Sequence, residues 1–343
     1  MPSPSNNVAI IAVAGARKTE AVIEGALGDP SRRVLITTYT NENLNQIARR
    51  IQAKVGVIPA HISIRSWFSF LLSEGIRPYQ HAVFGEVGLV RGLDFQGKRN
   101  QFAKKETRGY FLDRHGDVYK DAMADLACHA NERSSGSVVA RLEAVFDQIY
   151  IDEMQDLVGY DLDFLQLLLE SRIDVTAVGD PRQFTLATNQ GSRNKKYRGA
   201  GLVDWLDERT VLCRREDRST SARCSEGICE FASALFPNLP PLDAEEQITT
   251  GHDGVHTIEP HEVHAYVETY RPVVLRDSKT TDTLGQPAMN IGVAKGSTFD
   301  RVLIFPTKPM KKYLADGDST KLRAPERLYV AVTRARYSAA FVV

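Results

Sequence analysis

Short apolar runs that end in polar residues recur along the chain and predict parallel strands. Residues 8–14, 34–39 and 173–178 are such runs, each short enough for a strand buried on both faces of a sheet. Stretches typical of helices follow the first two runs, at residues 20–27 and about 42–53. This alternation indicates an α/β fold, in which ligands bind beyond the carboxyl ends of the strands.

The segment 149–156, I-Y-I-D-E-M-Q-D, has the most informative polar end. Its three apolar residues lead directly into Asp152 and Glu153, so the predicted strand ends in two carboxylates. Such a pair suits metal-assisted phosphoryl transfer, because one carboxylate can hold Mg²⁺ through its water shell while the other orients an attacking water. The alternative is an ordinary pair of solvated acids.

The first apolar run leads into Gly15, Ala16, Arg17, Lys18 and Thr19, ahead of a predicted helix. A strand, a tight turn, Lys-Thr and a helix form the layout that cradles a phosphate: backbone N–H groups face the anion, the lysine neutralises it and the hydroxyl ligates Mg²⁺. Glycine usually precedes the lysine, and Arg17 stands there instead. Its side chain could obstruct the nucleotide, turn outward or add a cation near the phosphates.

Composition and charge say more about where the protein works than about which reaction it catalyses. Lys and Arg total 43, as do Asp and Glu, so a surface for nucleic acid must be local. The four cysteines show no C-x-x-C spacing, which favours a reducing compartment. The N-terminus lacks a signal-peptide pattern, and no apolar run approaches membrane-spanning length. We therefore expect a cytoplasmic protein with no membrane partner.

The D-E-x-Q-D pattern at 152–156 resembles the metal-binding motif of superfamily 1 helicases of the UvrD/Rep type. Further stretches resemble other motifs of that family in the same order: G-D-P-R-Q at 179–183, R-C-S-E-G-I at 223–228, K-G-S-T-F-D at 295–300 and V-A-V-T-R-A at 330–335. The resemblance implies two RecA-like parallel-sheet domains of the P-loop NTPase class, with ATP bound between them. The first domain would comprise residues 1–75 and 146–210, with a small accessory insertion at 76–145, and the second residues 211–343.

The same resemblance implies roles for individual residues. Thr19 and Asp152 would hold Mg²⁺, and Glu153 would act on the attacking water. Three residues would stabilise the charge that develops on the γ-phosphoryl group, namely Gln183, Arg223 and Arg334. The residues expected to bind the nucleotide are Gly15, Ala16, Arg17, Lys18, Thr19 and Gly296.

Four further residues, in three stretches of the chain, are candidates for nucleic-acid contact. Thr40-Asn41 resembles the T-x-T-N segment whose threonine meets the single-stranded backbone, although Thr-Asn is also a good helix N-cap. Trp67, in S-W-F-S-F, stands where relatives have histidine and could stack on a base or pack in the core. Tyr197 precedes R-G-A after the polar stretch 185–196 and is the second stacking candidate.

The predicted insertion interleaves basic and aromatic residues. That composition suits contact with a phosphate backbone, and a solvated charged face is the alternative. The residues concerned are Phe95, Lys98, Arg99, Phe102, Lys104, Lys105, Arg108, Tyr110, Phe111 and Arg114.

The function expected from the resemblance is an ATP-dependent translocase or helicase on single-stranded DNA, moving 3′ to 5′, with RNA as a possible substrate. One alternative is a DNA-stimulated ATPase that serves as a switch in a larger complex, such as an anti-phage defence system with a nuclease partner. Another is a nucleotide-binding scaffold with attenuated hydrolysis, which Arg17 favours. Ala222 and Thr298 replace residues that contact adenine and ribose in relatives, so we expect weak base selectivity.

Overall fold

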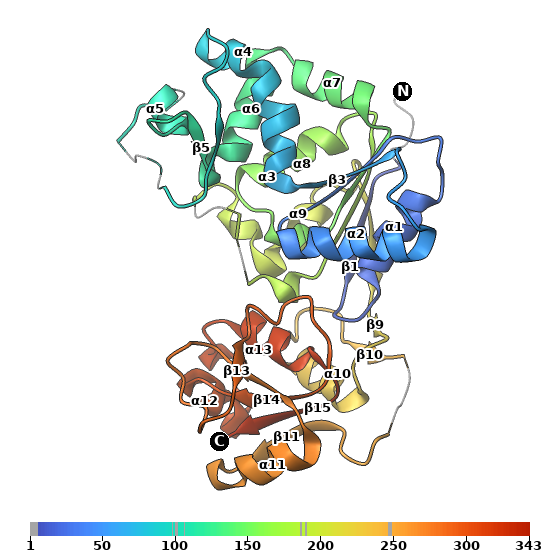
Figure 1. The fold of residues 1–343 in the computed structure, drawn as a ribbon, viewed down its shortest axis with the longest axis vertical. Coiled ribbons are helices and arrows are strands. Elements are labelled where there is room, and N and C mark those ends of the chain that lie inside the picture. The colour runs from blue at the N-terminus through green and yellow to red at the C-terminus, as the bar shows by residue number, and fades with distance from the viewer. Residues whose placement is uncertain are drawn as a thin grey trace. The chain divides into compact units, whose positions relative to one another are not determined.

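The computed structural model describes residues 6–97, 99, 102–105, 107–185, 187–188, 191–245 and 249–343 (Figure 1). The chain forms two compact units, each built from several segments. Unit 1 contains the residues up to Ile11, Lys18–Pro181 and Leu186–Glu216; unit 2 contains Ala12–Arg17, Arg182–Thr185 and Asp217–Val343. The predicted insertion, 76–145, belongs to unit 1, and Lys98 lies outside the described residues.

Unit 1 is organised around a six-stranded sheet. In spatial order its strands are β3 (Ile62–Ser66), β2 (Val34–Thr38), β6 (Gln148–Ile151), β7 (Asp174–Gly179), β1 (Val8–Ala12) and β8 (Arg214–Arg218). The five strands from β3 to β1 pair in parallel. All five residues of β2 are buried, as its unbroken apolar and threonine sequence predicts for a strand covered on both faces.

The other elements of unit 1 are mainly helices. They are α1 (Lys18–Leu27), α2 (Asn41–Val55), α3 (Trp67–Phe70), α4 (Gln80–Phe84), α5 (Arg108–Phe111), α6 (Met123–Arg133), α7 (Ser137–Val145), α8 (Tyr160–Leu169) and α9 (Leu202–Asp207), with a π-helical stretch at Leu71–Ile76 and a small parallel pair, β4 (Gly92–Asp94) and β5 (Asp117–Tyr119). One hydrophobic core runs from the sheet into α6 and α8.

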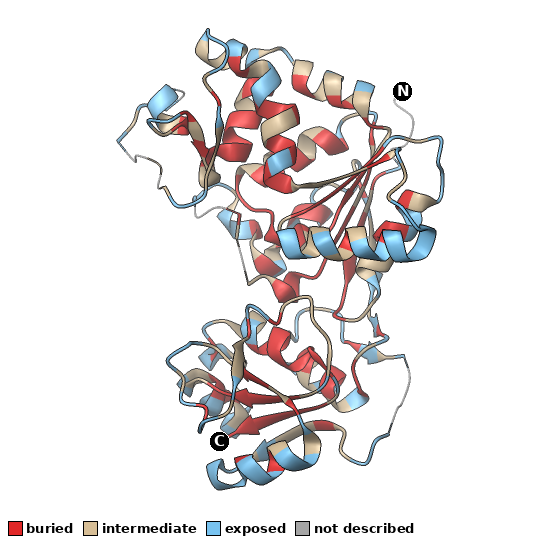
Figure 2. Cartoon of the chain, viewed as in Figure 1, coloured by how far each residue is buried: buried red, intermediate tan, exposed pale blue. Residues whose placement is uncertain are grey.

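Unit 2 has a five-stranded, fully parallel sheet. Its order is β11 (Gly254–Ile258), β15 (Ala335–Val342), β14 (Phe299–Phe305), β12 (Val273–Arg276) and β13 (Ala288–Asn290). The remaining elements are α10 (Glu226–Ala234), α11 (Val263–Tyr270), α12 (Lys308–Asp316), α13 (Pro325–Val332) and the short pair β9 (Thr220–Ser221) and β10 (Asp243–Ala244). Figure 2 shows both sheets lined by buried residues.

The predicted α/β class with parallel sheets is confirmed. The apolar runs at 8–14, 34–39 and 173–178 correspond to β1, β2 and β7, and the predicted helices correspond to α1 and α2. Across the described ranges, the structure contains no helix that is both long enough and apolar enough to cross a membrane.

Candidate functional site

The polar residues that follow the strands of unit 1 gather at one edge of its sheet. Asp152 and Glu153 come directly after β6, and Asp180 comes directly after its neighbour β7. Because these strands are parallel, their carboxyl ends meet at the same rim, where α/β folds place their ligands. Asp152 and Glu153 therefore lie where a bound ligand could contact both carboxylates.

Asp152 forms the centre of this rim. Its carboxylate is buried and accepts a hydrogen bond of 3.0 Å from the Thr19 hydroxyl, at the start of α1. Burial raises the pKa of Asp152 above the usual aspartate range, and the adjacent Glu153 charge raises it further. The hydrogen bond from Thr19 and the Lys18 charge oppose this rise in the pKa. A cation bound beside this buried carboxylate would stabilise its ionised form.

The oxygen atoms of Thr19 and Asp152 fit Mg²⁺, which prefers hard oxygen ligands. Among the described residues no group of three or more His, Cys, Asp or Glu side chains is arranged to hold a metal. Magnesium usually binds through one or two protein ligands together with substrate phosphates and water. The pair is therefore suited to Mg²⁺ that arrives with a nucleotide.

Glu153 adopts a left-handed backbone conformation with φ of 60°, which is uncommon for a residue other than glycine. Its amide donates a 3.0 Å hydrogen bond to Asp152. Its carboxylate accepts a hydrogen bond from the Gln155 side chain. Left-handed non-glycine residues cluster at functional sites, so this geometry agrees with a catalytic position for Glu153.

Gln155 links the ends of β6 and β7. Its amide nitrogen donates to Glu153, and its oxygen accepts a 3.0 Å hydrogen bond from the Asp180 backbone. A Cβ at Gly179 would lie 2.7 Å from that Gln155 oxygen, so glycine at this position leaves room for the Gln155 side chain. Sequence analysis assigned no role to Gln155, although its place inside the acidic motif could have suggested one.

The phosphate-loop residues before Lys18 make their described contacts within unit 2. The Ala14 amide donates to the Tyr329 hydroxyl at 3.1 Å, and the Gly15 carbonyl accepts from the Ala222 amide at 3.1 Å. Gly15 has φ of 83°, and a Cβ there would lie 2.4 Å from the Ser221 hydroxyl. Only glycine combines this backbone conformation with so close a contact.

Arg17 turns toward Glu245, the partner that sequence analysis could not identify. Their side chains form a 2.7 Å ion pair, with 65% of the Arg17 side chain exposed. Arg17 has φ of 54°, so the backbone at this position keeps the left-handed conformation that glycine favours. Of the three predicted orientations for the Arg17 side chain, the structure contains the outward one.

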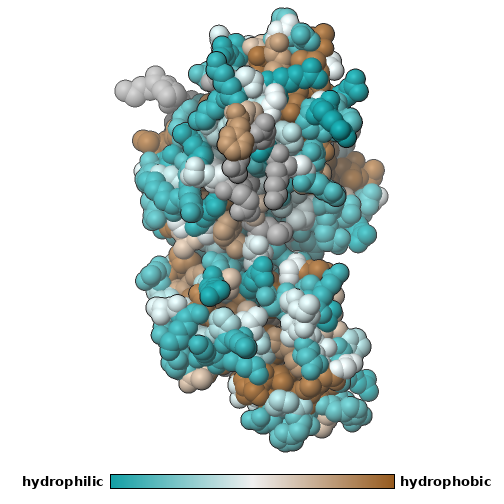
Figure 3. All heavy atoms as spheres, turned by 90° about the vertical axis from the view of Figure 1, so that its left-hand side faces the viewer, coloured by the Kyte–Doolittle hydropathy of each residue, from teal (hydrophilic) through white to brown (hydrophobic). Residues whose placement is uncertain are grey.

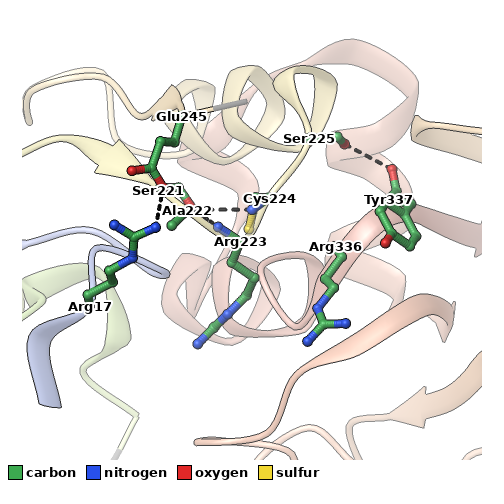
Figure 4. A pocket seen from close by; sticks show the side chains of 9 residues that line it. All are labelled: Arg17, Ser221, Ala222, Arg223, Cys224, Ser225, Glu245, Arg336 and Tyr337. Carbon is green, nitrogen blue, oxygen red and sulfur yellow. Dashed lines mark hydrogen bonds and ion pairs between the residues drawn. The ribbon is translucent and has the colours of Figure 1, made fainter. Parts of the chain in front are cut away.

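A pocket of about 100 Å³ lies beside this ion pair and belongs entirely to unit 2. Figure 4 shows Arg17 turned toward Glu245, while Arg223 and Arg336 extend in the same direction as each other. The Arg223 guanidinium donates to the Thr333 carbonyl at 3.2 Å. The pocket is lined by Arg17, Ser221, Ala222, Arg223, Cys224, Ser225, Glu245, Arg336 and Tyr337.

Arg334 follows α13 and is only 2% exposed. Its guanidinium donates to the carbonyls of Val330 at 3.2 Å and Ser297 at 3.3 Å, and to the Gln183 side chain at 3.4 Å. Gly296, directly before Ser297, has φ of 88°. The structure therefore brings Gln183, Gly296 and Arg334 together, although they are far apart in the sequence.

Of the two interpretations of Trp67, base stacking and core packing, the structure contains core packing. Trp67 is 1% exposed, and its indole N–H donates a 2.6 Å hydrogen bond to the Asp161 carboxylate on α8. The other oxygen of Asp161 accepts from the Thr188 hydroxyl. The indole is therefore fixed in the core, and Phe68 and Phe70 are buried beside it.

Tyr197 is likewise unsuited to stacking in this structure. It is 7% exposed, its hydroxyl is hydrogen-bonded to Glu208, and the Lys196 ammonium lies 4.4 Å from the centre of its ring. Arg209 also approaches the ring, at 5.9 Å. In this structure the ring is buried and contacts two cations, and base stacking by Tyr197 stays a prediction.

Thr40 and Asn41 lie at the carboxyl end of β2, on the same rim as Asp152. The Thr40 hydroxyl accepts a 3.2 Å hydrogen bond from the Asn43 amide, which confirms the N-cap interpretation. Asn41 is exposed. Contact of these two residues with nucleic acid stays a prediction that is compatible with the cap.

Comparison with protein families gives a match over residues 130–343 to the viral superfamily 1 RNA helicase core domain. The match does not include the phosphate loop. No curated protein matches the chain. The superfamily 1 level of the predicted resemblance is confirmed, whereas the UvrD/Rep branch is not, because the matching model describes the viral branch.

Two solved structures of arterivirus nonstructural protein 10 (helicase), one of them a complex with DNA, share the fold. They are 13% and 12% identical to the chain, cover 98% of it in both cases, and give TM-scores of 0.51 and 0.50. A PRRSV helicase is 18% identical over 97% of the chain, with a TM-score of 0.48. The chain spans 59%, 61% and 51% of these three structures, respectively.

Proposed function

Because the chain belongs to the viral superfamily 1 RNA helicase core domain family, we propose that it hydrolyses ATP to move along single-stranded nucleic acid. The observation that carries this proposal is the buried Asp152 at the end of β6, hydrogen-bonded to Thr19 at the start of α1 and followed directly by Glu153. A phosphate-binding helix start, a metal-binding carboxylate and a candidate base are the parts that phosphoryl transfer requires.

In this proposal Lys18 and the N–H groups that begin α1 bind the terminal phosphates of ATP. Thr19 and Asp152 hold Mg²⁺, which neutralises phosphate charge when it is bound. Glu153 accepts a proton from the attacking water, and its hydrogen bond from Gln155 orients the carboxylate. Gln155 also accepts a hydrogen bond from the backbone of Asp180, which lies shortly before Gln183 in the chain.

Arg223, Gln183 and Arg334 are the proposed groups that stabilise charge on the transferred phosphoryl group. Arg334 is suited to this role because its guanidinium is held by carbonyl and amide oxygens, which fix its position while leaving its positive charge in place. A fixed cation requires little reorganisation during the reaction.

The direct test is ATP hydrolysis by the purified chain with and without single-stranded DNA or RNA, with a Glu153→Gln variant to reveal contaminating activity. We expect hydrolysis that nucleic acid stimulates and that the substitution removes. Absence of hydrolysis under all of these conditions would reject the proposal. Parallel assays with GTP and CTP test the expected weak base selectivity.

The direction of movement and the choice between DNA and RNA are finer parts of the proposal. The UvrD/Rep resemblance predicts 3′ to 5′ movement on DNA, whereas the family match is to RNA helicases. Displacement of a short duplex carrying either a 3′ or a 5′ single-stranded overhang distinguishes the two directions. Repeating the assay with DNA and RNA tracking strands distinguishes the substrates.

A second candidate, a slow switch ATPase inside a larger complex, is favoured by Arg17. The Arg17–Glu245 ion pair holds the residue before the catalytic lysine in an outward conformation. A partner protein such as a nuclease is part of this alternative and stays a prediction.

We expect Arg17→Gly to raise kcat/KM for ATP about two- to fivefold, the equivalent of one partly exposed ion pair. Glycine accepts the left-handed backbone at this position without strain and releases the loop from Glu245. Steady-state hydrolysis measures the effect. Glu245→Gln is the matched variant, because it removes the same ion pair without changing the loop. A loss of activity in both variants would mean that the pair supports nucleotide binding.

A further inference from the structure

Phe95, in the predicted insertion of unit 1, is a large aromatic side chain on the surface. Phe95 is 61% exposed, yet its ring contacts another aromatic ring. One part of the ring packs edge to face on buried Phe68, with ring centres 5.7 Å apart and an interplanar angle of 82°. Phe68 in turn packs on Tyr39 at 5.4 Å. The three rings form an aromatic ladder whose outer member is Phe95.

The aromatic ladder stands at the edge of the sheet where the candidate site lies. Tyr39 directly follows β2, and Phe68 is the second residue of α3, which directly follows β3. Strand β2 pairs with β3 on one side and with β6, which ends in Asp152, on the other. The exposed ring is thus linked through Phe68 to Tyr39, the residue that precedes Thr40, the candidate contact for a nucleic-acid backbone.

A cationic side chain lies beside Tyr39, the inner ring of the ladder. The Lys120 ammonium lies 5.5 Å from the centre of the Tyr39 ring. Figure 3 faces the side of unit 1 that carries α5 and β5 and shows separate hydrophobic side chains on a mostly hydrophilic surface. Among the described residues of the insertion, the exposed cations after Phe95 are Lys104, Lys105, Arg108, Arg114 and Arg133.

We propose that Phe95 is a stacking platform for a base of single-stranded nucleic acid that lies across the carboxyl ends of β2 and β3. An aromatic face beside cations that neutralise phosphates is the combination that binds single strands without sequence preference. Phe95 takes the role that sequence analysis gave to Trp67, since Trp67 is fixed in the core by Asp161. The inference rests on the proposed movement along nucleic acid and names a residue that contacts the bases.

Anchoring distinguishes this ring from a hydrophobic residue that is merely exposed. Because Phe95 already packs on Phe68, which packs on Tyr39, a base that stacks on the Phe95 ring does not have to order a mobile side chain first. Stacking on Phe95 would also place the bound nucleic acid near the carboxyl end of β2, which pairs with β6, the strand that precedes Asp152.

The test measures binding of fluorescent single strands, dT20 and U20, to the full chain at one fixed salt concentration. We expect Phe95→Ala to raise Kd about 5- to 150-fold, the equivalent of one lost base–aromatic stack. Phe95→Trp should bind as tightly as the unmodified chain, and Phe95→Leu should resemble Phe95→Ala, because leucine keeps apolar bulk without an aromatic face. Thermal unfolding of each variant checks that the fold is intact.

An abasic strand of the same length separates stacking from other effects. Without bases there is nothing to stack, so the unmodified chain and Phe95→Ala should bind the abasic strand equally. An equal loss on normal and abasic strands, or unchanged binding of dT20 and U20, would overturn the inference. If the unmodified chain binds no single strand and shows no stimulated hydrolysis, the proposed function fails together with it. Stimulated hydrolysis combined with an inert Phe95 rejects the platform alone.

Discussion

Replacing Glu153 by glutamine is expected to lower kcat for ATP about 10²- to 10⁴-fold, the usual contribution of a positioned general base. Glutamine has nearly the same shape and keeps an oxygen that can accept the hydrogen bond from Gln155. It cannot accept a proton from the attacking water, so the chemical step slows while the local structure persists. Single-turnover hydrolysis at saturating ATP measures this step directly.

Binding of nucleotide to Glu153→Gln should remain intact. The Glu153 charge helps to raise the pKa of Asp152, so its removal lowers that pKa and favours the ionised form of Asp152. We therefore expect no loss of Mg²⁺–ATP affinity, measured by titration with a fluorescent ATP analogue. A kcat within about threefold of the unmodified value, well short of a general base's contribution, would exclude Glu153 as the base.

Replacing Arg334 by alanine is expected to lower kcat about 10³- to 10⁵-fold, the range for loss of an arginine finger. The side chain is almost completely buried, so thermal unfolding must show that the variant folds. Arg334→Lys is the second variant, because it keeps a positive charge without the planar guanidinium. We expect it to fold and to hydrolyse ATP slowly, because lysine cannot hold the same set of hydrogen bonds.

Arg327 lies on α13, the helix that precedes Arg334, and offers a matched control. It is half-exposed and forms an ion pair of 2.7 Å with Asp277. Arg327→Ala removes a cation from α13 without removing a proposed catalytic group, so kcat should change little. Equal losses for Arg327→Ala and Arg334→Ala would attribute both effects to the helix rather than to phosphoryl transfer.

The strands were predictable because buried parallel strands have continuous apolar sequences and end in polar residues. The pattern at 8–14 and 149–151 locates β1 and β6, and the residues that follow them locate Gly15 and Asp152. Thr19 and Asp152 follow β1 and β6, which lie on either side of β7 in one parallel sheet, so the carboxyl ends of both strands reach the same rim and their pairing too was within reach of the sequence.

The aromatic candidates were harder to predict, because the same residue type serves a core and a stacking surface. Nothing next to Trp67 in the sequence indicates Asp161, which lies 94 residues away and accepts its N–H. Phe95 was noted only as a member of a basic and aromatic stretch, and its contact with Phe68 depends on how the insertion folds back. The partner of Arg17 is 228 residues away, and no local pattern encodes it.

The assignment of residues 12–17 to unit 2 has a practical consequence for dividing the protein. Neither unit is a continuous stretch of chain, so no single cut releases one of them complete. A fragment that starts at Asp217 would lack Ala14 and Gly15, leaving Tyr329 and Ala222 without the loop groups they bind. Truncation at the apparent boundary would thus expose surface that the N-terminal segment covers, and the fragment would be prone to aggregate.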